Sequence, residues 1–115
     1  MDTNKQLVDV QLVRNMLYDD DGYVKEFAHA SIESFTEFRD SFKQHVMDRD
    51  IDELRRAGHK IKPAALMLNL NPVIDMYEKA KTLIENNTST EELSDLVNEM
   101  DSYSNQVIYE FNEIT

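Results

Sequence analysis

The chain has 115 residues, enough for one domain with a single hydrophobic core, and its 23 acidic and 12 basic side chains give a net charge of -11. This charge repels phosphate backbones and anionic lipids, and no stretch approaches the length of an apolar membrane span, so we expect neither nucleic-acid nor membrane binding. Cysteine is absent and only two glycines and two prolines occur, which argues against a disulfide framework and an all-β fold. We therefore expect one all-α domain over residues 1–115, located in the cytoplasm.

Apolar residues recur every three or four positions along most of the chain, which is the spacing of amphipathic helices. A first helix is expected over residues 4–18, and it ends at three aspartates, residues 19–21, followed by Gly22. A second helix is expected over residues 22–48. Its inward side chains follow a coiled-coil-like seam that comprises Val24, Ala28, Ser31, Phe35, Phe38, Phe42 and His45.

The third helix has a capping signal at its start, where the Asp50 side chain can accept hydrogen bonds from free amides and Glu53 can reach back. It is expected to end near Asn69, because asparagine adopts the left-handed conformation of a helix C-terminus more readily than most residues. Its buried face is expected to comprise Ile51, Leu54, Gly58, Ile61, Ala65 and Leu68.

Two further helices follow after short polar breaks. Asn71 and Pro72 are interpreted as the N-cap and first helical position of a fourth helix that runs to about Glu85. Ser89 and Glu92 form a capping box for the last helix, whose seam comprises Leu93, Leu96, Met100, Tyr103, Val107, Phe111 and Ile114. Together the segments predict an antiparallel four-helix bundle with a short extra N-terminal helix, which we expect to be monomeric.

His59 lies in the third helix among basic residues, because residues 54–62 hold four cations and no acid. Since His59 directly follows Gly58 of the buried face, its side chain is expected to project from a flank and to be accessible. Three cations are helical neighbours of the imidazole, and they could stabilise an anion attached to the ring: Arg55, Arg56 and Lys62. The simpler interpretation is an ordinary surface histidine on a solvated basic face.

Pro63 makes that simpler interpretation less attractive. An interior proline removes an amide donor and clashes with the carbonyl four residues earlier, here that of His59, at a cost of about 3 kcal/mol. Either the helix is bent or loosened at the histidine for a functional reason, or the surrounding packing tolerates the proline.

The stretch from residue 58 to residue 68 resembles the signature of histidine-containing phosphotransfer domains. That signature runs small residue, phosphoaccepting histidine, any residue, aliphatic residue, lysine, glycine and two small residues, with a later aliphatic residue and a glycine. Two positions depart from it, since Pro63 and Asn69 stand where glycines are usual. The matching residues follow in order: Gly58, His59, Ile61, Lys62, Ala64, Ala65 and Leu68.

The resemblance implies a phosphorelay intermediate without kinase activity of its own. His59 would accept a phosphoryl group from a receiver-domain aspartate of a hybrid histidine kinase and pass it to the receiver of a response regulator. Lys62 would balance the charge of the phosphoryl oxygens. No cofactor is expected on this chain, because the receivers bring the magnesium ion. Partner binding is assigned to Arg55, Arg56, Pro63 and Leu66.

Several alternatives stay open at this point. The main one is a helical module that docks or sequesters receivers or other proteins without being phosphorylated. Leu66 either adds exposed apolar area for docking or forms a buried flank of the core. A di-iron site is not expected, because Glu26 and His29 form the only Glu-x-x-His pair of the chain. The initial Met1 and the absence of a linker favour a free-standing protein over a piece of a hybrid kinase.

Overall fold

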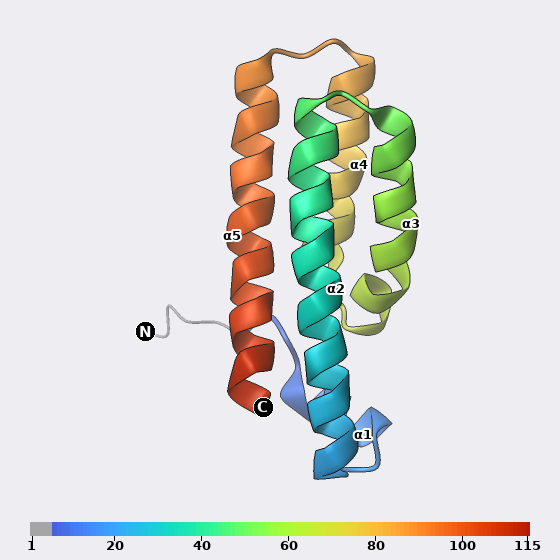
Figure 1. Cartoon of the computed structure of the whole chain (residues 1–115), viewed down its shortest axis with the longest axis vertical. Coiled ribbons are helices and arrows are strands. Elements are labelled where there is room, and N and C mark those ends of the chain that lie inside the picture. Colours follow the sequence, from blue (N-terminus) through green and yellow to red (C-terminus); the bar gives the residue numbers. More distant parts are fainter. Residues whose placement is uncertain (1–5) are drawn as a thin grey trace.

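The computed structural model describes residues 6–115, and these form five α-helices without a strand (Figure 1). The prediction of an all-α fold is therefore confirmed. Within the described residues, no helix combines the length and the apolar character that crossing a membrane requires. The helices are α1 (Val10–Met16), α2 (Asp21–Met47), α3 (Ile51–Met67), α4 (Asn71–Glu85) and α5 (Thr90–Ile114).

Helices α2 to α5 lie side by side, and α1 lies at the end of the bundle where α2 begins (Figure 1). Helix α2 makes its most extensive contact with α5, and it also packs against α3; α4 packs against both α3 and α5. The aromatic rings predicted for the α2 seam lie in this core, where Phe35 and Phe42 are fully buried. Phe35 stacks on Phe111 of α5 with ring centroids 6.5 Å apart. The spacing of apolar residues by three and four positions thus identified the core face of α2.

The predicted capping residues explain most of the helix boundaries. The Asp50 side chain accepts a hydrogen bond from the Glu53 amide, and Ser89 accepts one from the Glu92 amide, as the sequence predicted. Glu53 does not reach back as expected, because its carboxylate bonds to Arg56 and the Asp50 amide donates to the carbonyl of His45. Asn69 has the expected left-handed backbone, with φ of 57°. As a result, α3 and α5 begin and end within one or two residues of the predicted bounds.

The assignment of Asn71 as the N-cap of α4 was wrong by one residue. Asn71 is the first residue of α4, and the N-cap is Leu70, which supplies no side-chain hydrogen bond. Leu70 is fully buried, and its amide donates to the carbonyl of Ala65 at 2.8 Å. The turn between α3 and α4 is therefore determined by burial of Leu70 in the core and not by a polar N-cap.

The first helix is shorter than predicted, and the start expected at residue 4 lies outside the described residues. Asp9 caps α1 by accepting a hydrogen bond from the Leu12 amide. Before it, the amides of Leu7 and Val8 donate to the carboxylate of Glu110 on α5, at 2.9 Å and 2.7 Å. Because Glu110 takes up these amides in a non-helical conformation, the segment cannot continue the helix towards the N-terminus.

Candidate functional site

Helix α3 presents His59 on its outward side. Residues Leu54, Gly58, Ile61 and Ala65 are buried, as predicted, whereas His59 is exposed. Leu66 is 53 % exposed, which decides between the two interpretations of this residue in favour of an accessible apolar side chain. Helical geometry places five exposed residues on this side, which we call the His59 face: Arg55, His59, Lys62, Pro63 and Leu66.

Gly58 lets α4 approach the backbone directly beside His59. A Cβ atom on Gly58 would lie 2.2 Å from Cζ of Tyr77, far closer than two carbon atoms can approach. The Tyr77 side chain is only 6 % exposed, so its ring fills the space that the missing side chain leaves between α3 and α4. The sequence predicted that Gly58 faces inward, but it did not identify Tyr77 as the residue that packs on it.

Lys81 lies over the ring of the same tyrosine, with Nζ 4.6 Å from the centre of the Tyr77 ring. Burial alone would lower the pKa of Lys81, but its bond to the Glu78 carboxylate and the neighbouring charges raise that pKa above its ordinary value. The ammonium therefore stays charged over the ring. This contact helps to hold Tyr77 against Gly58, which fixes the backbone from which His59 projects.

Pro63 lies inside α3, which stays helical to Met67. Proline has no amide hydrogen, so the carbonyl of His59 lacks its usual donor four residues later. The proline thus removes one hydrogen bond at the histidine without ending the helix.

The four cations around His59 differ in their partners. Lys60 Nζ lies 2.6 Å from the Glu37 carboxylate of α2, and Arg56 bonds to Glu53 one turn earlier in α3. Arg55 has two longer contacts, described below. Among residues 6–115, Lys62 is the one member of the group with no carboxylate at ion-pair distance. Its ammonium is therefore available to a group attached to the imidazole three residues earlier.

Arg55 reaches away from the histidine towards the start of α3 and the end of α4. Its guanidinium lies 4.0 Å from the carboxylate of Asp52 and 3.6 Å from that of Glu85. Both distances exceed those of ordinary charge-assisted hydrogen bonds. Glu85 could not be identified from the sequence, because a contact between α3 and α4 depends on the packing of the two helices.

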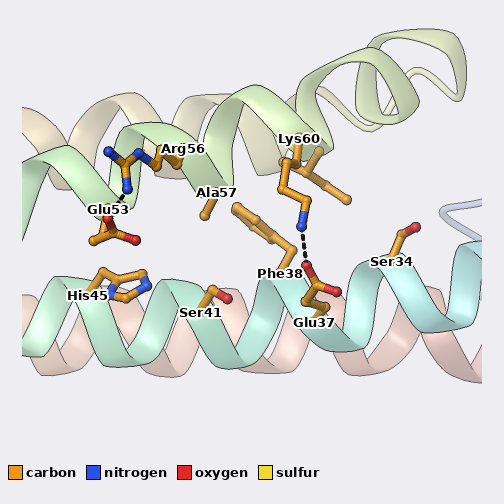
Figure 2. Close-up of a pocket in the computed structure, with 10 residues that line it drawn as sticks. Ser34, Glu37, Phe38, Ser41, His45, Glu53, Arg56, Ala57 and Lys60 are labelled. Carbon is orange, nitrogen blue, oxygen red and sulfur yellow. Dashed lines mark hydrogen bonds and ion pairs between the residues drawn. The ribbon is translucent and has the colours of Figure 1, made fainter.

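A groove of about 340 Å³ runs between α2 and α3 beside the His59 face (Figure 2). Two ion pairs lie along it, Arg56 with Glu53 and Lys60 with Glu37, and its apolar floor contains Phe38 and Ile61. His59 does not line this groove. Arg56, which the sequence grouped with His59, therefore lies on the groove side of α3. The remaining lining residues are Ser34, Ser41, His45 and Ala57.

The other two histidines lie on α2, away from the His59 face. His29 is exposed, and His45 is half-buried at the far end of the groove from Ser34; the inward position that the seam assigned to His45 is taken by the fully buried Val46. Within residues 6–115, no three histidine, aspartate or glutamate side chains are grouped closely enough to hold a metal ion. The chemistry available on the His59 face is thus that of an accessible imidazole with an unpaired ammonium beside it.

No family model, curated protein or solved structure matches this chain.

Proposed function

We propose that this chain is a phosphorelay intermediate and that its helices α2 to α5 form the antiparallel four-helix bundle of a histidine-containing phosphotransfer domain. Helix α1 is then the short extra N-terminal helix. His59 accepts a phosphoryl group from an aspartate of one receiver domain and passes it to an aspartate of another. The observation that carries the proposal is the exposed His59 within a phosphotransfer-like sequence, with Lys62 as an unpaired cation one turn away.

The transfer requires little of this chain beyond a nucleophile and charge. One imidazole nitrogen of His59 attacks phosphorus, and a nitrogen–phosphorus bond forms as the bond to the aspartyl oxygen breaks. The electron pair of that bond leaves on the receiver's carboxylate, and the proton on the other ring nitrogen stays in place. The onward step to a second receiver reverses these changes.

Lys62 and the rigidity of α3 provide what the reaction needs besides the imidazole. The Lys62 ammonium reduces the repulsion between the incoming phosphoryl oxygens and this acidic chain, whose net charge is -11. The contact between Gly58 and Tyr77 holds the helix at the point of attack, which lowers the entropic cost of alignment. Magnesium bound by the receiver supplies further positive charge. Autonomous kinase activity is not part of this proposal.

Exposed Leu66 and exposed Pro63 provide a docking surface for the receiver next to the histidine. Leu66 supplies apolar area, and the exposed proline ring shapes the surface one turn after His59. Arg55 contributes positive charge to the same face, and Arg56 contributes it from the groove side. These charges complement an acidic receiver surface.

The decisive experiment is phosphoryl transfer from receivers charged with a small-molecule phosphodonor. We expect acid-labile, base-stable label on the wild-type chain and on the control variant His29→Gln, which removes another exposed histidine of α2. The variant His59→Gln should take up no label. Label that persists in His59→Gln would show that another residue carries the phosphoryl group.

The groove between α2 and α3 supports a second candidate, a module that docks receivers or other proteins without being phosphorylated. Its apolar floor and ionic walls offer a binding surface that needs no chemistry at His59. A docking module would retain its partners after the change His59→Gln and would take no label from any receiver. Uptake of label by the wild-type chain, measured together with binding of the receivers, therefore separates the candidates.

A further inference from the structure

The cations around His59 can be ranked by how firmly neighbouring carboxylates hold them. Lys60 and Arg56 are held by short contacts to Glu37 and Glu53, and both line the groove away from the histidine. Arg55, on the His59 face, has only the longer contacts to Asp52 and Glu85. Because its carboxylate contacts are the longest, Arg55 is the most loosely held of the three paired cations.

The geometry of a helix places His59 and Arg55 within reach of each other. Residues four apart share one face, with Cβ atoms about 5–6 Å apart. Side chains in a helix lean towards its N-terminus, so the imidazole of His59 lies over the turn that contains Arg55. A group attached to the outer ring nitrogen would thus extend towards Arg55.

We propose that Arg55 exchanges its carboxylate partners for the phosphoryl group when His59 is phosphorylated, which breaks the ionic link between α3 and α4. The inference rests on the proposed function only in that His59 carries the phosphoryl group. No covalent step is added, because the exchange replaces one ion pair by another. The partner in this contact is the phosphoryl group itself, and Glu85 acts as the competitor that holds Arg55 in the unphosphorylated chain.

Charge and geometry favour the phosphoryl group over the carboxylates. A phosphoryl group brings nearly two negative charges and three acceptor oxygens to one place, whereas Glu85 brings one charge at a distance of 3.6 Å. The planar guanidinium can donate two parallel hydrogen bonds to such a group. Lys62 contributes a single point of positive charge from the other side of the histidine. The two cations therefore enclose the phosphoryl oxygens from both neighbouring turns.

The exchange predicts a slower loss of the phosphoryl group. Hydrolysis proceeds through a loose transition state, in which the oxygens carry less negative charge than in the ground state. Arg55 bound to the oxygens stabilises the ground state more strongly than that transition state. Removal of Arg55 should shorten the lifetime of phosphohistidine, and removal of its competitor Glu85 should lengthen it.

The test uses phosphoramidate, a chemical donor that phosphorylates accessible imidazoles without a receiver. The half-life of the acid-labile phosphorus signal is followed by ³¹P NMR, with His59→Gln to identify the signal of His59. We expect Arg55→Gln to shorten the half-life roughly two- to fivefold, and Glu85→Gln to lengthen it by up to a similar factor. The matched control is Glu37→Gln, which frees Lys60 in the groove and should leave the half-life unchanged.

A second readout reports the exchange directly and would not respond to a merely structural role. In wild-type protein, the Arg55 Nε–H resonance and the Glu85 carboxyl resonance should both shift on phosphorylation of His59. Labelled His59 with unmoved Arg55 and Glu85 resonances would overturn the exchange and leave the relay intact. A His59 that takes no phosphoryl group from phosphoramidate would overturn both proposals, whereas label from phosphoramidate but from no receiver would overturn the relay alone.

Discussion

The middle of α3 and the segment before α1 are each determined by one residue of a distant helix, in opposite ways. On α3, the Tyr77 ring excludes any side chain at Gly58. Before α1, the Glu110 carboxylate accepts hydrogen bonds from the amides of Leu7 and Val8. The first contact depends on shape and the second on satisfying polar groups. A steric contact of this kind can be anticipated from the sequence, because it requires a small residue on a buried helix face. A carboxylate that binds backbone amides of a distant segment has no such sequence signal.

The largest effect should come from filling the space at Gly58. In Gly58→Ala the new Cβ atom would overlap the Tyr77 ring, so one of the two helices must move. We expect a loss of about 2–3 kcal/mol in the free energy of unfolding, measured by urea denaturation. Gly22→Ala is the matched control, because its Cβ atom would meet only the Asp20 side chain, at 3.1 Å, and should change stability by less than about 1 kcal/mol.

A smaller effect on stability is expected from removing the Glu110 carboxylate. Glu110 is 3 % exposed, and it also accepts a hydrogen bond from the Gln106 side chain at 2.8 Å. In Glu110→Ala the amides of Leu7 and Val8 lose their acceptor, which should cost about 1–3 kcal/mol in urea denaturation. Glu110→Gln keeps one acceptor oxygen and should cost less. If hydrogen exchange of both amides stayed as slow in Glu110→Ala as in the wild type, this account of the segment would be wrong.

The smallest effect concerns Tyr103, a half-buried residue of α5 near Glu110. Burial, and after it the negative charge of Glu110, raises the pKa of Tyr103 above its ordinary value. Because the folded chain then holds this proton more tightly than the unfolded chain, Tyr103 should reduce stability only above the ordinary tyrosine pKa. The ring carbon signal of Tyr103 in ¹³C NMR reports its titration. Glu110→Gln should move that titration to lower pH, and an unchanged midpoint would exclude the influence of Glu110.

The parts of this molecule that depend on local sequence could be predicted, and the parts that depend on helix packing could not. Periodicity identified Phe35 and Phe42 as core, and cap chemistry identified Asp50 and Ser89, because these signals act within a few residues. The N-cap at Leu70 was missed, since burial of that leucine overrides the cap expected at Asn71.

The candidate site likewise has parts that could be predicted from local sequence and parts that depend on helix packing. His59 could be found as an exposed residue from its place beside Gly58, and Lys62 from its spacing in the motif. Neither the partner of Arg55 on α4 nor the position of Arg56 in the groove could be found, because both depend on how α2, α3 and α4 are placed relative to one another. Phosphorylation of His59 itself stays a prediction.

Pro63 has a consequence for the way α3 opens in the native state. With the hydrogen bond to the His59 carbonyl missing, the ladder of amide bonds along this helix is interrupted between its first three turns and its last ones. The C-terminal turns are then held by the burial of Ala65 and Leu68 in the core more than by the amide ladder, so their hydrogen exchange should follow the stability of the core.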